Sequence, residues 1–276
     1  MFDNPKSCAK NENGPGGEAG GPVESCPGRL DAGVLFLCDH AANDLPSAYG
    51  TLGLLREDLE SHIAFDIGAA EITRRLAARL EAPAILTRFS RLLIDANRGG
   101  DDPTLVMQLS DGRVIPGNAG IMQAEIDARR QRFWQPYRDA IGKMIDAMSA
   151  RGPVPAVVSL HSFTPHWRGA RRPWQVAVLW DSDARMAQPL IAALAAEGWV
   201  VGDNEPYDGA LHGDTLYDQV TRRGLAGLLI ETRQDLIDTA DKACAFADRL
   251  ADILKPIVAR PEMHRVENLR SRTDKV

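Results

Sequence analysis

The chain has 276 residues, 44% of them hydrophobic and 25% charged, which are ordinary values for a globular protein long enough to bury a full core. Its formal net charge of −6 disfavours nucleic acid and anionic membranes as main partners, because both attract a basic surface. No apolar run approaches the roughly 18 residues of a transmembrane helix, and the N-terminus lacks the basic and apolar segments of a signal peptide. We therefore expect a cytoplasmic protein whose main partner is neither nucleic acid nor a membrane.

Three regions of the chain differ in composition. Residues 1–30 are rich in glycine, proline, asparagine and glutamate and hold almost no large apolar side chains. Because they bury too little surface to offset their ordering entropy, we predict a disordered tail. Residues 31–256 are predicted to form a single α/β domain, and residues 257–276 a loose, charged tail. The four cysteines match neither a zinc knuckle nor a disulfide framework, so we expect reduced thiols.

Apolar periodicity predicts strands and helices that alternate along the domain. In chain order, the predicted elements are a strand at residues 34–38, a helix at 66–80, a strand at 84–88, a helix at 123–151, strands at 156–160 and 175–180, a helix at 184–197, a strand from 200, a helix at 216–223, a strand at 225–231 and a helix at 239–254. Pro136 can bend the longest helix, and residues 181–183 can cap the helix at 184–197. The alternation is typical of a three-layer α/β/α domain with a mixed, mainly parallel sheet.

Two histidines follow predicted strands directly. His40 comes after the strand at 34–38, and His161 after the strand at 156–160. The carboxyl ends of strands are where α/β sheets usually place their chemistry, so both rings can point into one crevice. Two imidazoles and one carboxylate with an open fourth position make a catalytic zinc site. Taken singly, each histidine is better explained by a structural role, and it is their joint position that indicates a metal site.

The third metal ligand has four candidates, namely Asp39, Asn43, Asp66 and Glu231. The neutral amide of Asn43 is a poor zinc ligand. Asp66 stands at the start of the helix at 66–80 and can face the crevice, or it can cap that helix or sit in its first turn. All four candidates stay open on this evidence.

Further charged residues can serve a substrate. Glu231 follows a buried apolar run, where a carboxylate is expensive unless it is used as a general base or paired with an arginine such as Arg233. Arg88, Arg91 and Arg98 form an arginine-rich segment suited to carboxylates or to an oxyanion, or to a solvated surface. Two loops can contribute: residues 99–120 have the length of a lid or binding loop, and residues 202–214 carry glycines that allow close approach to a ligand. From the second loop we expect Asn204 and His212 to contact substrate.

Taken together, six segments of the chain resemble the N-formylglutamate amidohydrolase family. The segments are CDHAANDLP, HIAFDIGA, TRFSRLLIDANR, SLHSFTP, NEPYDG and LLIETRQDL, and the resemblance extends over residues 33–254. That family is similar in turn to zinc carboxypeptidases and aspartoacylases. The resemblance implies a zinc-carboxypeptidase-like (phosphorylase/hydrolase-like) fold with an eight-stranded mixed sheet and one zinc ion.

The resemblance also implies roles for individual residues. His40 resembles the first zinc ligand and His161 the last, and Glu231 resembles the catalytic base. Asn97 and Arg98 resemble the pair that binds the substrate carboxylate, and Arg88 or Arg91 the arginine that polarises the scissile carbonyl. Asn43 stands where the related enzymes have a glutamate ligand, which leaves Asp66 as the expected third ligand.

The implied activity is metal-dependent hydrolysis of the C–N amide bond of an N-formyl or N-acyl amino acid such as N-formylglutamate. Two alternatives stay open at this point. One is a carboxypeptidase or amidase that acts on a peptide-like or cell-wall-derived substrate, for which residues 99–120 would have to leave room. The other is a non-catalytic relative that binds carboxylates and has lost tight metal binding.

Overall fold

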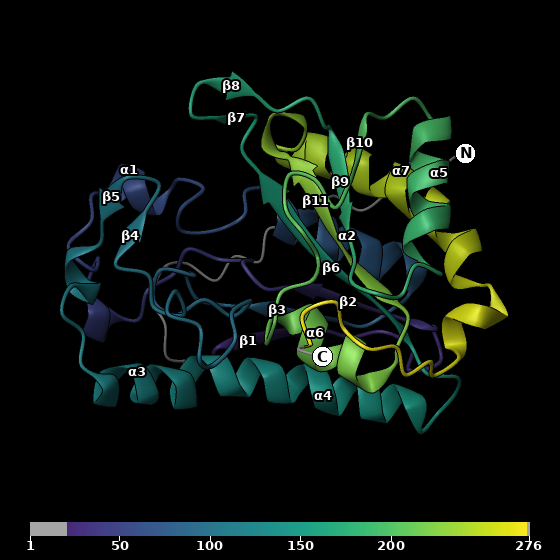
Figure 1. Cartoon of the computed structure of the whole chain (residues 1–276), viewed down its shortest axis with the longest axis horizontal. Coiled ribbons are helices and arrows are strands. Elements are labelled where there is room, and N and C mark those ends of the chain that lie inside the picture. The colour runs from purple at the N-terminus through teal and green to yellow at the C-terminus, as the bar shows by residue number, and fades with distance from the viewer. Residues whose placement is uncertain (1–20, 275–276) are drawn as a thin grey trace, which may run out of the picture.

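The computed structural model describes residues 21–274. Its main sheet has seven strands in the order β1-β3-β2-β6-β11-β9-β10. They are β1 (Val23–Cys26), β2 (Val34–Cys38), β3 (Ala84–Thr87), β6 (Ala156–Phe163), β9 (Val176–Leu179), β10 (Val201–Asp203) and β11 (Gly227–Arg233). The β1–β3 and β11–β9 pairs are antiparallel, and the other neighbours are parallel. The mixed, mainly parallel sheet is thus confirmed, with seven strands in the described residues instead of eight (Figure 1).

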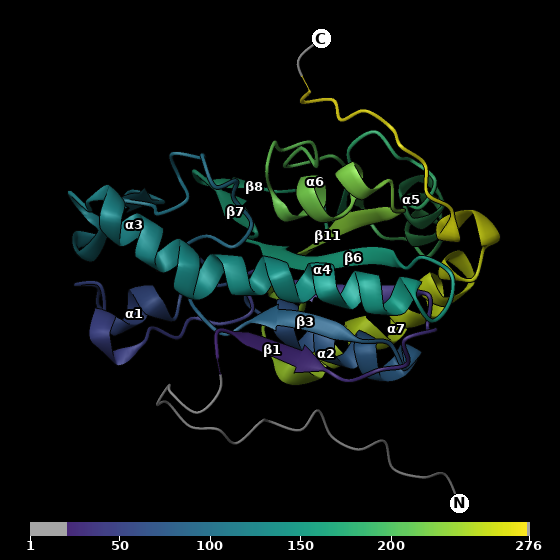
Figure 2. The ribbon, with the colours of Figure 1, turned by 90° about the horizontal axis from the view of Figure 1, so that it is seen from below.

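Helices cover both faces of this sheet. The α-helices of the described residues are α1 (Arg56–Leu59), α2 (Ala69–Leu80), α3 (Gln123–Arg129), α4 (Gln135–Ser149), α5 (Ala187–Ala196), α6 (Thr215–Gln219) and α7 (Ala240–Val258), of which α1 and α3 lie to the side of the sheet (Figure 1). Because successive strand residues point to opposite faces, Phe36 packs in the core with α2, α5 and α7, whereas Leu35 and Leu37 pack in the core with α4 and α6. Figure 2 shows α3 and α4 running as one long rod along the second face. None of the helices within residues 21–274 combines the length and apolarity that a bilayer crossing needs.

The predicted N-terminal boundary is too late. Residues 23–26, expected in the disordered tail, form the edge strand β1, which pairs with β3. The side chain of Glu24 binds Arg74 at 2.8 Å, so an ion pair between sheet and helix holds this short strand in place. The predicted disorder of residues 1–20 lies outside the described residues.

The predicted C-terminal tail is also packed where the structure describes it. The α7 helix continues to Val258, four residues beyond its predicted end. Further on, Arg272 donates to Asp208 at 2.6 Å and to the carbonyl of Trp180 at 2.7 Å, and Ser271 is buried. Charged residues that suggested a loose tail therefore fasten it to the domain.

Two local predictions about helices are corrected. The long helix at 123–151 is divided into α3, a π-helical turn over residues 130–134, and α4. The wide turn directly precedes Pro136, which has no N–H to donate to the preceding turn. The predicted cap of the α5 helix is wrong, because α5 begins only at Ala187 and Asp183 binds the backbone and side chain of Arg185 instead.

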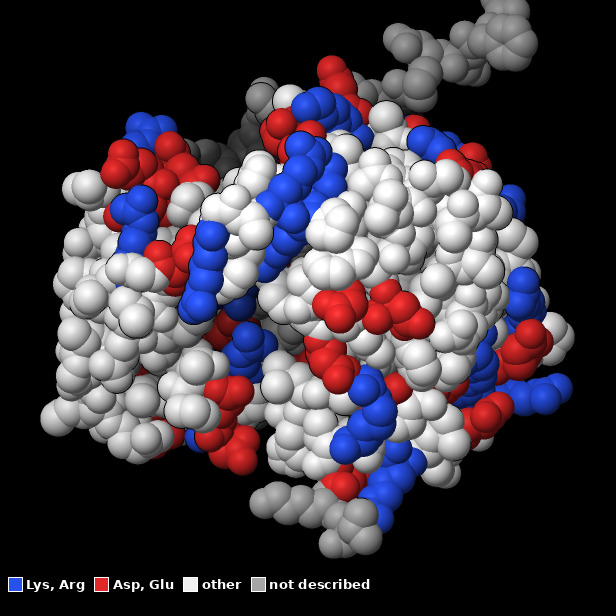
Figure 3. Space-filling model, turned by 45° about the horizontal axis from the view of Figure 1, so that its top comes forward, with Lys and Arg blue, Asp and Glu red and all other residues white. Residues whose placement is uncertain are grey.

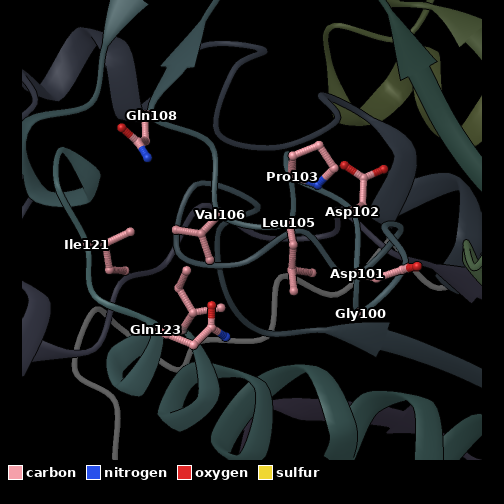
Figure 4. A pocket seen from close by; sticks show the side chains of 10 residues that line it. Gly100, Asp101, Asp102, Pro103, Leu105, Val106, Gln108, Ile121 and Gln123 are labelled. Carbon is pink, nitrogen blue, oxygen red and sulfur yellow. The ribbon is translucent and has the colours of Figure 1, made fainter.

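The segment 99–120 holds a small hairpin of β4 (Leu109–Ser110) and β5 (Arg113–Val114). A pocket of about 360 Å³ lies between this segment and the start of α3 (Figure 4). Polar side chains from Asp101, Gln108 and Gln123 line part of it. None of the candidate site residues does, so this pocket is separate from the predicted crevice. Among the cysteines, Cys26 and Cys38 are free thiols, whereas Cys244 is disulfide-bonded, contrary to the expectation of reduced thiols.

Candidate metal centre and active site

Three candidate ligands converge on one buried point. His40 follows β2, Asp66 lies in the turn before α2, and His161 lies within β6. One potential ligand atom from each residue lies within 4.8 Å of the others, and all three side chains are buried. The predicted strand at 156–160 is too short, because β6 continues through His161 to Phe163. His161 therefore projects from within the sheet. This group of residues can hold a metal ion.

A single oxygen atom of Asp66 links the two rings. Asp66 Oδ2 lies 3.3 Å from His40 Nδ1 and 2.9 Å from His161 Nδ1, and it also accepts from the backbone N–H of Ser162 at 3.2 Å. Asp66 does not cap the helix, because the N-cap of α2 is Gly68 in the left-handed conformation. The backbone N–H of Asp66 donates instead to the carbonyl of His40, which ties the turn to the end of β2.

The other nitrogen of each ring faces a second carboxylate. His40 Nε2 lies 2.8 Å from Asp95 Oδ1, and His161 Nε2 lies 2.9 Å from Asp39 Oδ2. Histidine ligands of metals usually donate their second ring N–H to a carboxylate, which leaves the lone pair of the first nitrogen free. Both Nδ1 atoms are thereby presented towards Asp66. The sequence reading missed Asp95 in this role, although a carboxylate directly after the apolar run Leu92–Leu93–Ile94 was a detectable signal.

Several hydrogen bonds hold the two supporting carboxylates. Asp39 accepts from Ser159 at 2.7 Å and from Thr215 at 2.6 Å. Asp95 accepts from the backbone N–H of Asn97 at 2.9 Å. Both aspartates are buried, so these bonds compensate for the loss of water and fix the orientation of the carboxylates.

Charge pairing decides the ionisation of this cluster. Burial alone would raise the pKa of Asp39, but the hydrogen bond from His161 and its charge lower this pKa to about 2. Burial would likewise raise the pKa of Asp66, yet the charges and hydrogen bonds of His40 and His161 hold it below its usual range. For His161, hydrogen bonds to Asp39 and Asp66 overcome burial and raise the pKa well above its usual value.

Glu231 lies beside the cluster and is also inside a strand. In the β11–β6 pairing it is directly opposite His161, so both side chains project from the same face of the sheet. Its Oε2 atom is buried without a hydrogen-bond partner among the described residues. Burial raises the pKa of Glu231 to about 7. The alternative pairing with Arg233 is wrong, because the Arg233 guanidinium binds Asp235 at 2.7 Å.

The two candidate carbonyl-polarising arginines lie in different places. Arg91 binds Asp95 at 2.7 Å and lies 3.5 Å from Asp66, so it belongs to the cluster. Its Nε atom is buried without a hydrogen-bond partner among the described residues. Arg88 comes directly after β3. Because side chains alternate along a strand, it is on the same face of the sheet as Leu86, which is the face opposite the cluster. The pKa of Glu24 is lowered by its hydrogen bond to Arg74 and by the charges of Arg74 and Arg88, although burial acts in the opposite direction.

The predicted substrate-binding pair lies at the rim of the cluster. Asn97 is buried, and its Oδ1 accepts from the backbone N–H of Thr215 at 3.1 Å. The Arg98 guanidinium donates to the carbonyl of Asn97 at 3.1 Å and to the Thr104 hydroxyl at 3.3 Å. Within residues 21–274, no carboxylate forms an ion pair with Arg98. Its charge is therefore available for an anionic ligand.

Three other candidates have structural contacts instead. Asn204 Oδ1 accepts from the backbone N–H groups of Trp180 and Gly209, which holds the loop around residues 204–209. His212 is exposed and packs its ring against Tyr217 at 4.7 Å between centroids. Asn43 donates to the carbonyl of Leu59 at 2.8 Å. These contacts do not place the three side chains in the His40–Asp66–His161 group, and neither Asn204 nor His212 was distinguishable from a loop residue by sequence.

Comparison with known proteins places this geometry in context. The model of the N-formylglutamate amidohydrolase family matches residues 32–238. The structure of gene product Atu2144 from Agrobacterium tumefaciens is similar, with a TM-score of 0.81 and 33% identity over 87% of this chain and 96% of that one. N-formylglutamate amidohydrolase from Ralstonia eutropha JMP134 has the same fold, with a TM-score of 0.66 and 17% identity over 86% of this chain and 97% of that one. No curated protein sequence matches the chain.

Proposed function

The chain belongs to the N-formylglutamate amidohydrolase family and is a hydrolase that acts on amide C–N bonds, and from that premise we propose that it is a zinc-dependent hydrolase of N-formyl or N-acyl amino acids such as N-formylglutamate. The observation that carries the proposal is the convergence of His40, Asp66 and His161, with a supporting carboxylate behind each imidazole. Two nitrogens and one oxygen are a donor set that suits zinc.

In this proposal, His40 Nδ1, His161 Nδ1 and one oxygen of Asp66 hold the metal ion. When bound there, zinc supplies Lewis acidity that polarises a carbonyl and acidifies a water molecule. The ion would also offset the negative charge of Asp66 next to Glu231. Asp39 and Asp95 keep the two rings in the tautomer that leaves Nδ1 free for a ligand bond.

Glu231 acts as the general base in this proposal. The carboxylate has an unpartnered oxygen and projects from the sheet beside His161. A base whose pKa lies close to neutrality takes a proton from water efficiently and can then give it to the leaving amine. This exchange places the proton on the amine nitrogen as the C–N bond breaks.

Two arginines complete the assignment. In this proposal Arg91, whose guanidinium lies 3.5 Å from the Asp66 carboxylate, stabilises the negative charge that develops on the scissile carbonyl oxygen. Arg98, with the adjacent Asn97, binds the α-carboxylate of the amino acid, because its guanidinium lacks an ion-pair partner in the described residues.

The test measures hydrolysis of a panel of N-formyl and N-acetyl amino acids by the metal-free protein, with and without added zinc. We expect zinc-dependent release of amine, together with about one zinc bound per chain. A protein that binds zinc at this stoichiometry and hydrolyses no panel member would contradict the proposed substrate class. Hydrolysis that is equal in a chelator and in zinc would contradict the metal dependence.

A further inference from the structure

Arg172 is a buried arginine outside the His40–Asp66–His161 group. It follows the short hairpin of β7 (His166–Trp167) and β8 (Ala170–Arg171) and is 7% exposed. Its guanidinium lies 5.4 Å from the ring of Phe163, 5.4 Å from that of Trp167 and 5.2 Å from that of Tyr207. These aromatic contacts hold the planar group in a fixed orientation.

The charge of this guanidinium has no acidic partner. Its hydrogen bonds run to the carbonyl and hydroxyl of Thr164, both at 3.3 Å, and to the Tyr207 hydroxyl at 2.9 Å. Within residues 21–274, no carboxylate forms an ion pair with it, whereas Arg171, its exposed neighbour, lies 4.0 Å from Asp235. A buried charge without a counter-ion is costly, so this arrangement suits an anion supplied by a ligand.

The position of Arg172 relates it to the reaction site. Phe163, on which the guanidinium packs, follows His161 by two residues in β6, so both side chains lie on one face of the sheet roughly 6.6 Å apart along the strand. The same face carries Glu231, paired with His161, and a small apolar cluster that includes Leu179 and Leu229. Arg172 therefore packs on a side chain that lies two residues along β6 from His161.

Tyr207 lies beside this guanidinium, because its hydroxyl accepts a hydrogen bond from Arg172 at 2.9 Å. In the view of Figure 3, lysine and arginine side chains gather in a band beside a hollow that contains acidic and basic groups. The β7–β8 hairpin and the residue that follows it carry three arginines, Arg168, Arg171 and Arg172.

We propose that Arg172 determines specificity by binding a side-chain carboxylate of the substrate, so that the enzyme selects acidic N-acyl amino acids. This inference rests on the proposed function and adds a second anion site to it. Arg98 binds the carboxylate that every amino acid carries, and Arg172 binds the one that only acidic side chains carry. The planar guanidinium, oriented by three rings, offers parallel N–H groups to the two carboxylate oxygens.

The experiment compares N-formyl-L-glutamate with N-formyl-L-glutamine in the zinc-loaded wild type and in Arg172→Gln, Arg172→Lys and Arg171→Ala. We expect Arg172→Gln to lower kcat/KM for the glutamate substrate by about 10- to 100-fold, mainly through KM, and to change kcat/KM for the glutamine substrate little. Arg172→Lys should keep part of the preference because it keeps the charge. Arg171→Ala, on the same hairpin, should behave as the wild type does.

A second measurement separates this inference from the proposed function. Calorimetric binding of L-glutamate and L-glutamine to the same four proteins needs no turnover. One result would support the anion site but contradict the proposed activity. In that case the wild type hydrolyses neither substrate, binds glutamate more tightly than glutamine, and loses this preference in Arg172→Gln. If Arg172→Gln, folded as judged by its melting temperature, keeps the wild-type preference in hydrolysis or binding, the inference is overturned. The inference would also be overturned if the wild type bound glutamate and glutamine with equal affinity and hydrolysed their N-formyl derivatives with equal kcat/KM.

Discussion

Asp39 Oδ2 and His161 Nε2 lie 2.9 Å apart, on the side of the imidazole that faces away from Asp66. Because Asp39 is ionised, His161 must donate from Nε2, which leaves Nδ1 to accept a metal ion or to pair with Asp66. The hydroxyl groups of Ser159 and Thr215 fix the carboxylate in this orientation. The orientation of this candidate ligand is therefore set by residues outside the His40–Asp66–His161 group as well as by Asp66.

We predict that Asp39→Asn weakens zinc binding by about 10- to 100-fold. The amide N–H of the new side chain can donate to Nε2, which favours the tautomer with a proton on Nδ1 and removes the lone pair needed by the metal. Competition with a chromophoric chelator measures the affinity. Asp238→Asn, at an exposed aspartate paired with Lys242, is the matched control and should bind zinc normally. Unchanged affinity in Asp39→Asn would refute the positioning role.

We predict that Glu231→Gln lowers turnover by roughly 10²- to 10⁴-fold while zinc content stays the same. The substitution preserves shape and removes the proton acceptor opposite His161. Steady-state kinetics on the best substrate, with metal analysis of the same sample, provide the measurement. Glu197→Gln changes a surface glutamate that pairs with Arg249 and serves as the control. Near-normal activity of Glu231→Gln would exclude Glu231 as the base.

The sequence predicted the parts of the site that depend on strand ends. His40, His161 and Glu231 were found because each terminates or interrupts an apolar run, and parallel neighbours bring such positions together. Asp66 was nominated because the family resemblance places Asn43 at the position of a glutamate ligand, and it lies with both histidines. These positions are recognised from the residues around them, so the prediction holds even when the predicted strand boundaries are wrong by a few residues.

Other features depended on tertiary contacts that no local pattern encodes. Arg88 continues the alternation of β3 away from the cluster, whereas the turn after the strand brings Arg91 to Asp66 and Asp95. Arg172 carries no local signal in the sequence, because its burial depends on Phe163 and Tyr207, which lie elsewhere in the chain. The strand β1 was missed because pairing with β3 and an ion pair to Arg74 compensate for its weak apolar character.

We predict that the metal-free protein loses stability between about pH 4.5 and 6.5, partly through Asp214. This buried residue caps α6 by accepting from the N–H of Tyr217 at 2.7 Å, and burial raises its pKa from 3.8 to about 7. Over this range the folded chain keeps a proton on Asp214 that the unfolded chain releases, so the free energy of unfolding falls as pH rises, by about 1.4 kcal/mol per pH unit for one proton.

Asp214→Asn provides the check on this assignment, because the asparagine keeps the capping oxygen and cannot titrate. Urea unfolding in the presence of a chelator should show a pH slope for this variant that is shallower than the wild-type slope by about one proton. Glu231 also has a raised pKa, so the variant should retain part of the decrease. Parallel slopes in the two proteins would contradict the buried, protonated state of Asp214.

Zinc should stabilise the folded protein, and this stabilisation should depend on His161. The three donors come from β2, the turn before α2, and β6, so they meet only in the folded chain, and binding energy becomes folding energy. At a free zinc concentration of about 100 times Kd, the free energy of unfolding should rise by about 2.7 kcal/mol. Thermal unfolding with zinc and with a chelator measures the shift. We expect His161→Ala to abolish it and His62→Ala, at a histidine paired with Asp111 outside the cluster, to preserve it. Because both variants lose one imidazole, a shift that persists in His161→Ala would show that zinc acts at another place in the molecule.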